Sequence, residues 1–226
     1  MSRFEVHSVH CPRCGHAQDE KIYVSVNGDR IRTAADDIIA AEFGHVHCEA
    51  CGRDYYTDST LLYTEFSRQL WILQYRLADL PRYRECEIEA AAVFEREYFE
   101  RSPPAVAAQA RQANVRVCFG RPQLAEKLLA RRHEIDDRAL ECLKLVITRD
   151  HMADLLKYGP TELVLADCNA SHLKLLAIAA DERKPVHEFQ IDRRDLHDVE
   201  AGLDDFRQPF PDLFDKLYVN AARYLT

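Results

Sequence analysis

The sequence predicts an α+β protein, and three observations about its patterning carry this prediction. Residues 1–80 hold short alternating segments around two Cys-x-x-Cys pairs, residues 81–160 are rich in helix formers, and residues 161–226 begin with apolar runs separated by turn residues. Alternation with a period of two favours strands, whereas a period near 3.6 favours helices. We therefore expect a β-rich region, a helical region with one strand, and a small antiparallel sheet with helices. The second and third regions are compatible with packing as one domain.

The N-terminal region is expected to consist of short strands and one helix. Residues 3–10 alternate between apolar and polar side chains, and residues 22–26 are β-branched and aromatic. The second run stops at Asn27-Gly28, a dipeptide typical of hairpin turns. Thr33 can cap a short helix over 34–39. Further strands are expected at 55–56, 61–63 and 70–75.

The middle region reads as mainly helical. Helices are expected at 88–99, after Pro104, at about 122–132 and at 137–157, with one strand at 115–119. Proline is tolerated in a first helical turn, and Gly159-Pro160 is a typical helix stop.

The C-terminal region is expected to begin with an antiparallel meander of three strands at 162–168, 173–178 and 186–191. Residues 175–180 fit a buried helical turn equally well, because short apolar runs do not separate the two states by period. Acidic helical residues and a break at Pro209 and Pro211 precede a final apolar segment at 217–225.

Composition restricts the class of protein. The chain has 226 residues, of which 47% are hydrophobic and 30% charged, as in ordinary soluble globular proteins. It has no apolar run long enough for a membrane helix and no signal-peptide core at its start, so a cytoplasmic protein is expected. The net charge of −8 argues against a general nucleic-acid binder, although residues 101–160 carry 11 basic against 7 acidic residues.

Four of the eight cysteines form two pairs, Cys11/Cys14 and Cys48/Cys51. In a reducing compartment such pairs hold metal more often than disulfides. Two intervening residues let both thiolates of a tight turn converge on one ion, and two such turns complete a tetrahedral site. A thioredoxin-like dithiol is disfavoured, because no strand–helix junction of a βαβ unit surrounds either pair. We therefore expect a zinc-ribbon-like N-terminal part with one Zn²⁺.

The predicted zinc is structural. Four thiolates fill a tetrahedron, whereas a catalytic zinc keeps one position open for water or substrate. A glycine follows each second cysteine, where the chain tends to need a positive φ. Five histidines near the pairs are expected in the second shell or at the surface: His7, His10, His16, His45 and His47.

These motifs resemble the bacterial CpXC proteins, which are named for their Cys-Pro-x-Cys pairs. The resemblance covers roughly residues 5–150 and includes the paired knuckles, the Leu62-Tyr63 strand and the block around Ile135-Asp136-Asp137. Glu49 stands where the second pair would carry proline. The resemblance implies a bacterial cytoplasmic protein with a zinc-bearing N-terminal region, and it supplies no function.

The remaining cysteines and the aromatic cluster are expected in the core. Cys86, Cys118, Cys142 and Cys168 lie among apolar neighbours, as small buried thiols do. Trp71 and the tyrosines and phenylalanine near it, Tyr63, Phe66 and Tyr75, are expected to pack in the N-terminal sheet.

Two further groups of charged residues are candidate sites with a simpler alternative. Asp136 and Asp137, with Glu141, fit a carboxylate cluster, but aspartate at a helix start is also good capping chemistry, with ion pairs along the helix. Lys127, Arg131 and Arg132 fit a phosphate or nucleic-acid site that Arg116 could join, yet cations also suit the end of a helix.

Three functional hypotheses follow. The favoured one is a non-catalytic, zinc-stabilised binding protein whose partner is another protein, such as an adaptor or an immunity-like protein, because an acidic surface can steer toward a basic partner. The second is a nucleic-acid or nucleotide-binding regulator that uses residues 101–160. The third is an enzyme acting through Asp136, Asp137, Glu141 or a free thiol such as Cys118.

Overall fold

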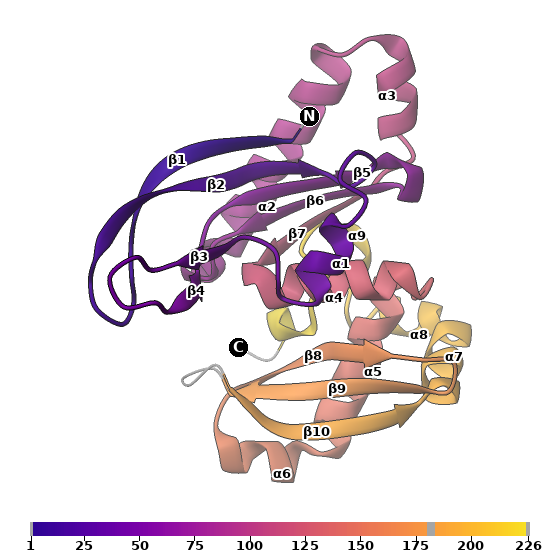
Figure 1. Cartoon of the computed structure of the whole chain (residues 1–226). Coiled ribbons are helices and arrows are strands. Elements are labelled where there is room, and N and C mark those ends of the chain that lie inside the picture. Colours follow the sequence, from indigo (N-terminus) through magenta and orange to yellow (C-terminus); the bar gives the residue numbers. More distant parts are fainter. Residues whose placement is uncertain (1, 180–183, 225–226) are drawn as a thin grey trace. The chain divides into compact units, whose positions relative to one another are not determined.

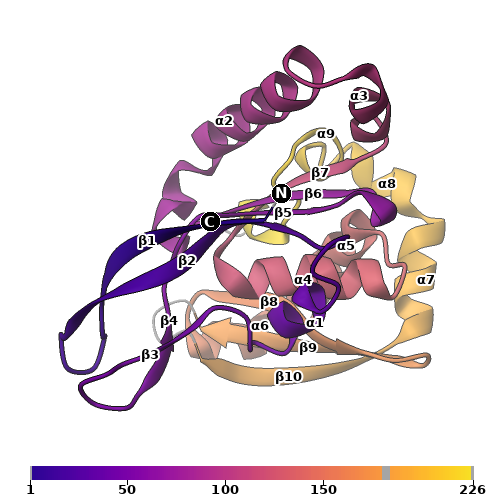
Figure 2. The same ribbon diagram turned by 45° about the horizontal axis from the view of Figure 1, so that its top comes forward.

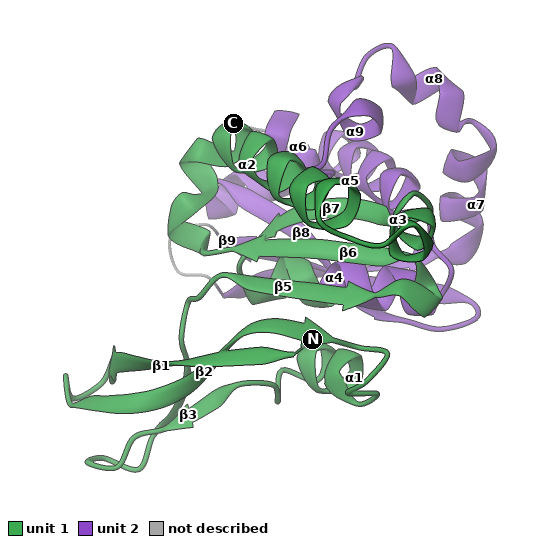
Figure 3. Cartoon of the chain, turned by 90° about the horizontal axis from the view of Figure 1, so that it is seen from above, with its two compact units in different colours: residues 1–125 green, residues 126–226 purple. Residues whose placement is uncertain are grey.

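The computed structural model describes residues 2–179 and 184–224. It confirms the α+β class, with helices, mixed sheets and a C-terminal three-stranded antiparallel sheet. The chain forms two compact units, unit 1 (Met1–Ala125) and unit 2 (Glu126–Thr226) (Figure 3). The three-part division expected from the sequence stays a prediction.

Unit 1 is built on a five-stranded mixed sheet (Figure 1). β1 and β2 pair antiparallel, β2 and β5 parallel, β5 and β6 antiparallel, and β6 and β7 parallel. In sheet order, the strands are β1 (Arg3–His10), β2 (Ala17–Asn27), β5 (Leu61–Glu65), β6 (Leu70–Tyr75) and β7 (Asn114–Phe119). All of the strands expected in these stretches are present, and the one at 115–119 joins the sheet of the N-terminal region.

The prediction of a hairpin turn at Asn27-Gly28 is wrong. β2 pairs with the preceding strand β1, and the chain after Gly28 leads into helix α1 (Ala34–Ile39). The Gly28 amide donates to the Thr64 carbonyl at 2.8 Å, and a Cβ on Gly28 would overlap the Tyr63 hydroxyl. Glycine is thus required here for close approach to β5. Thr33 occupies the N-cap position of α1 without a side-chain capping bond.

The remaining elements of unit 1 are a second hairpin and a helical segment. The hairpin consists of β3 (His45–His47) and β4 (Asp54–Tyr56), which pair antiparallel. The helical segment contains α2 (Tyr83–Glu95), the π-helical turn η3 (Arg96–Glu100) and α3 (Pro104–Ala110), as expected before and after the Pro103-Pro104 break. Two 3₁₀ turns, η1 (Phe66–Arg68) and η2 (Leu77–Arg82), flank β6.

Large aromatic side chains fill the core of unit 1. Trp71 and Tyr63 are fully buried, and the Trp71 ring meets the Phe94 ring of α2 edge-to-face with 5.3 Å between centroids. Such pairs contribute beyond the area that they bury. The core packing expected for Trp71 and Tyr63 is confirmed, whereas Phe66 and Tyr75 are only partly buried.

Unit 2 combines a three-stranded antiparallel sheet with helices. The sheet order is β10 (Pro185–Asp192), β9 (His172–Ala179) and β8 (Thr161–Cys168). Buried and half-buried residues alternate along β9, so the described part of the possible helical turn at 175–180 is strand, and Ala180 lies outside the described residues. The helical elements are α4 (Gly120–Arg132, which begins in unit 1), α5 (Asp137–Asp150), α6 (Met152–Leu155), η4 (Leu156–Tyr158), α7 (Arg193–Ala201), α8 (Leu203–Arg207), α9 (Asp212–Asp215) and η5 (Ala221–Tyr224).

The single helix expected at 137–157 is broken. α5 ends at Asp150, and His151, with φ −112° and ψ 17°, separates it from α6. The expected stop at Gly159-Pro160 is confirmed, because η4 ends directly before Gly159. Of the expected final segment at 217–225, Leu225 lies outside the described residues. Within the described ranges, no helix has the length and apolar character that crossing a membrane requires.

Candidate metal centre

The two Cys-x-x-Cys pairs form two matching loops at the ends of two hairpins. The first loop joins β1 to β2 and the second joins β3 to β4 (Figure 2). The Gly15 amide donates to the Cys11 carbonyl and the Gly52 amide to the Cys48 carbonyl, both at 2.9 Å. Gly15 and Gly52 have φ of +74° and +67°, and a Cβ on either would meet no atom within 4 Å. Backbone conformation, not space, is therefore what requires glycine in both loops.

The four sulfur atoms gather in one cluster. The Sγ atoms of Cys11, Cys14, Cys48 and Cys51 all lie within 4.8 Å of one another. Cys11 and Cys51 are 3.7 Å apart and Cys14 and Cys48 are 3.6 Å apart, so all four thiols are free of disulfides. A tetrahedral ion with metal–sulfur bonds of about 2.3 Å separates its ligands by about 3.8 Å. The cluster therefore fits one ion with four thiolate ligands.

Ionisation of the four thiols also requires a cation between them. Burial opposes ionisation of Cys11, but the backbone N–H groups of Cys14 and Arg13 and two neighbouring thiols stabilise its thiolate, and its pKa is lowered to about 6. The backbone N–H of His16 favours the Cys14 thiolate, yet burial and the three other thiols outweigh it and raise the pKa of Cys14 to about 12. Adjacent thiolates repel one another, so ionisation of all four requires a positive ion between them.

The cluster is buried on one side by a small apolar core. Cys11 and Cys48 are buried, Cys51 is half-buried and Cys14 is exposed. Ile22, Val46 and Tyr55 pack with the two buried cysteines. The five neighbouring histidines are exposed and lie outside the cluster. His47 pairs with Asp54 at 2.8 Å, and the ring of His45 packs at a tilt of 37° against that of Tyr56.

One side chain that the sequence did not single out links the two loops. Gln18 of β2 is buried, its Nε2 donates to the His47 carbonyl at 2.8 Å, and its Oε1 accepts from the Glu49 amide at 3.1 Å. Proline has no amide hydrogen and could not make the second bond. The backbone amide at position 49 therefore ties the second loop to the first hairpin. No local spacing signals this contact, because 31 residues separate the two partners.

Replacing Glu49 by proline tests this link. The first loop holds Pro12 at the matching position and has the same backbone bonds, so proline fits the turn. Any loss of stability should then come from the buried Gln18 side-chain oxygen, which loses its donor. We expect Glu49→Pro to lower the free energy of unfolding of unit 1 by about 1–3 kcal/mol with the metal retained. Glu49→Ala keeps the amide and should be neutral in the same chemical denaturation experiment. Equal losses in both variants would contradict the role of the amide.

The comparison with known families addresses the same region. The family model described as CpXC protein matches residues 9–144, which is more than half of the chain. The chain belongs to the CpXC protein family. The resemblance noted from the knuckles and the Asp-Asp block is thereby confirmed. No curated protein and no solved structure matches the chain.

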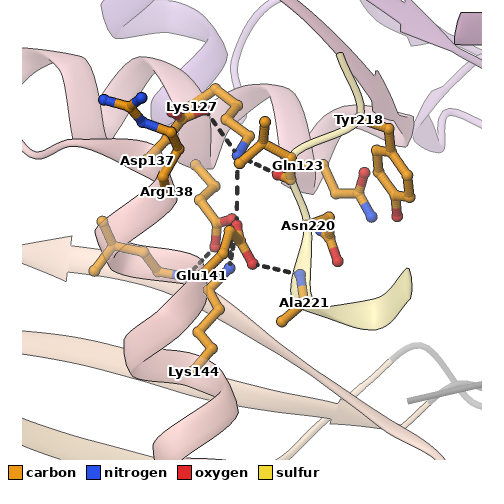
Figure 4. A network of polar contacts seen from close by, with 12 residues as sticks. Gln123, Lys127, Asp137, Arg138, Glu141, Lys144, Tyr218, Asn220 and Ala221 are labelled. Atoms are coloured by element: carbon orange, nitrogen blue, oxygen red, sulfur yellow. Dashed lines mark hydrogen bonds and ion pairs between the residues drawn. The ribbon is translucent and has the colours of Figure 1, made fainter. Parts of the chain in front are cut away.

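The candidate carboxylate cluster of this CpXC protein, Asp136, Asp137 and Glu141, lies in unit 2, and its members have different surroundings. Asp136 is the N-cap of α5, where its carboxylate accepts from the Arg138 amide at 2.9 Å and pairs with the Arg138 guanidinium. The capping interpretation is confirmed for this residue. Asp137 and Glu141 point instead into a group of buried charges (Figure 4).

This buried ion network consists of three carboxylates and two ammonium groups. Glu141 accepts from Lys144 at 3.0 Å and from the Ala221 amide at 2.8 Å. Lys127 donates to the Val219 carbonyl at 2.6 Å and pairs with Asp137 at 3.2 Å. Lys144 also pairs with Glu126, at 2.6 Å. All five members are at most 7% exposed: Glu126, Lys127, Asp137, Glu141 and Lys144.

The network links four segments of unit 2 that are distant in the sequence. Glu126 and Lys127 lie on α4 and Glu141 and Lys144 on α5, while the Leu165 amide of β8 donates to Glu126. The Val219 carbonyl and the Ala221 amide join the network from near the far end of the chain. The cavity beside Lys144 has a volume of about 10 Å³, which is room for about one water molecule.

One carboxylate of the network has a pKa well above its ordinary value. Burial raises the pKa of Glu126 to about 7, although Lys144 opposes this shift. Burial also disfavours the Glu141 carboxylate, but Lys144, Lys127 and the Ala221 amide outweigh it and lower the pKa of Glu141. Both carboxylates interact with Lys144. Glu141 stays ionised because Lys127 and the Ala221 amide stabilise it as well. A proton taken up near neutral pH should therefore reside on Glu126.

This assignment predicts a pH dependence. Because the folded pKa of Glu126 lies above the ordinary value of 4.5, its stabilising contribution is complete below pH 4.5 and is lost as the pH rises through about 7. The free energy of unfolding of unit 2 should fall over this range by at most about 1.4 kcal/mol per pH unit. Carbon-detected NMR of the glutamate carboxyls should show one titration near pH 7. Glu126→Gln should remove that titration and flatten the slope, and an unchanged slope would contradict the assignment.

The structure gives the basic residues different surroundings within the described chain. Lys127 is buried in the ion network, so its charge is neutralised there. Arg116 lies on β7 of unit 1 and is half-buried, as is Arg131 on α4, whereas Arg132 is exposed. A binding role for Arg116, Arg131 and Arg132 stays a prediction. The four other cysteines, Cys86, Cys118, Cys142 and Cys168, are buried, as expected.

Proposed function

We propose that this CpXC protein is a zinc-stabilised binding protein of the cytoplasm, and that its partner is another protein. The observation that carries the proposal is the closed set of four thiolates at the spacing of a tetrahedral ion. Tetrahedral thiolate sites select zinc or iron, and four protein ligands leave no position for water or substrate. Such an ion contributes to folding and leaves function to the surface.

The ion itself is tested by metal analysis of the protein purified without added metal. One zinc per chain and a colourless solution support the proposal. One iron per chain with visible thiolate-to-iron absorption would replace zinc with iron. A chain without metal, whose four thiols all react with a thiol reagent in the folded state, would overturn the structural site.

The partner surface is proposed to be the acidic helices of unit 2. Residues 192–215 contain eight acidic residues and three arginines. Asp195 and Asp198 on α7 and Asp204 and Asp205 on α8 are exposed. A field of this sign attracts a basic partner and speeds its association, and the effect weakens with salt. We therefore expect a partner with a basic surface.

Affinity purification from the native cell with matched variants tests this surface. The wild type should retain a protein that Asp198→Asn/Asp204→Asn/Asp205→Asn loses. The control Asp19→Asn/Glu42→Asn/Glu85→Gln removes the same charge from exposed positions of unit 1 and should retain it. Retention by both variants would contradict the acidic helices. Retention of nucleic acid in place of protein, released by salt, would favour the regulator hypothesis.

A further inference from the structure

The outer edge of β1 is open. β1 is the terminal strand of its sheet, and its outer edge pairs with no other strand of the described chain (Figures 1 and 2). Seven of its eight residues are exposed. It lacks proline and lysine, which commonly protect edge strands, and the irregularity in its pairing is confined to Arg3/Phe4. Residues 4–10 thus present a regular row of backbone donors and acceptors.

Two large apolar side chains stand on this edge. Phe4 is 50% exposed and Val6 is 62% exposed, and both point to the same face because successive strand residues alternate. On the neighbouring strand β2, Tyr23 is opposite Phe4 and Lys21 is opposite Val6. The Lys21 ammonium also lies 5.3 Å from the centre of the Phe4 ring. A strand added at the edge would cover the two apolar side chains as well as satisfy the backbone.

The sequence of β1 is complementary to itself in one antiparallel register. A two-fold axis perpendicular to the sheet keeps each residue on its own face, so opposed residues have the same parity. With Val6 on the axis, Glu5 of each chain is opposite His7 of the other, and Phe4 is opposite Ser8. Moving the axis to Glu5 opposes two glutamates, and moving it to His7 opposes two histidines. Moving it to Phe4 or Ser8 shortens the pairing.

We propose that a second copy of this chain adds to β1, joining two five-stranded sheets across a two-fold axis at Val6. Arg3–Val9 of one copy would pair with Val9–Arg3 of the other. The interface would cover Phe4 and Val6 and place two Glu5–His7 pairs on the opposite face. It goes beyond the proposed function, because the acidic helices of unit 2 are not part of it.

Light scattering after gel filtration, together with sedimentation equilibrium, tests the association. The wild type should show a dimer of twice 26.1 kDa that dissociates on dilution through the micromolar range. Val6→Lys, which opposes two ammonium groups on the axis, should be monomeric with unchanged metal content and circular dichroism. A wild type that remains a monomer throughout, or a Val6→Lys dimer as tight as the wild type, would overturn the proposal. Neither result would affect partner capture by the acidic helices.

Charge exchange and cross-linking test the register. Glu5→Lys and His7→Glu should each weaken the dimer about tenfold, since each pair occurs twice, and the double variant should restore it. Opposed Cα atoms lie about 4.5–5.5 Å apart, within disulfide reach, so Val6→Cys should form a disulfide-linked dimer on oxidation. Ser8→Cys is the matched control, because its two copies would be about 14 Å apart. Cross-linking of Ser8→Cys but not of Val6→Cys would overturn this register.

Discussion

Replacing Cys48 with serine is expected to abolish stoichiometric metal binding and to unfold both hairpins of the metal centre. Cys48 is fully buried and supplies one of four ligands, and its loop holds the second hairpin to the first. Structural zinc contributes about 10–16 kcal/mol of binding free energy, which is folding free energy when no site exists in the unfolded chain. The apolar core at the site has three buried non-cysteine members, Ile22, Val46 and Tyr55, and is too small to replace the ion.

Metal content and amide hydrogen exchange measure this effect. Metal content should fall from one ion per chain to none, and protection should be lost at β1–β4 but kept at β5–β7. Cys86→Ala is the control, because Cys86 is equally buried in unit 1 but lies outside the cluster. Addition of a strong chelator to the wild type should reproduce the exchange pattern of Cys48→Ser. Full protection of the hairpins in the metal-free chain would refute a structural role for the ion.

Replacing Lys144 with methionine is expected to destabilise unit 2 by about 3–5 kcal/mol, because the change leaves two buried carboxylates without their shared cation. Glu126 and Glu141 lie 2.6 and 3.0 Å from the Lys144 ammonium. Lys157→Met is a matched control. Lys157 and Asp154 are also 2.6 Å apart, but both side chains are more than 60% exposed. Loss of that surface pair should change the free energy of unfolding by less than about 1 kcal/mol.

A second change distinguishes charge from packing. In Lys144→Met/Glu126→Gln both charges of the shortest pair are removed, and most of the lost stability should return, since replacing both partners avoids an unpaired buried charge. Urea denaturation of the three variants and the wild type measures the differences. If the double variant is as unstable as Lys144→Met, lost packing of the lysine stem is the cause, and the electrostatic account fails.

Local patterns were enough to predict the cluster of four cysteines. Each knuckle is a short loop whose ligands, glycine and backbone bonds lie within six residues, so spacing alone identifies it. Strand periodicity placed β1, β2 and the unit 2 meander for the same reason. The split of the long helix at His151 has no matching signal, because no glycine or proline lies inside residues 137–157.

Contacts between distant segments were out of reach. The sequence indicated that Glu141 and Lys144 share a helix face, and they do pair, but spacing cannot show that the pair is fully buried. Burial depends on Val219 and Ala221, which lie about 80 residues further along the chain. The parallel pairing of β2 with β5 depends likewise on a long connection, so Asn27-Gly28 resembled a hairpin turn.

The bond between Gln18 and the Glu49 amide has a consequence for how this family diverges. A chain with proline in the second knuckle has no donor for the Gln18 side chain, so selection should no longer hold glutamine at that position. A chain with any other residue in the second knuckle keeps the donor and should keep an acceptor on the equivalent of β2. The two positions should therefore change together during evolution, although neither binds the metal and 31 residues separate them.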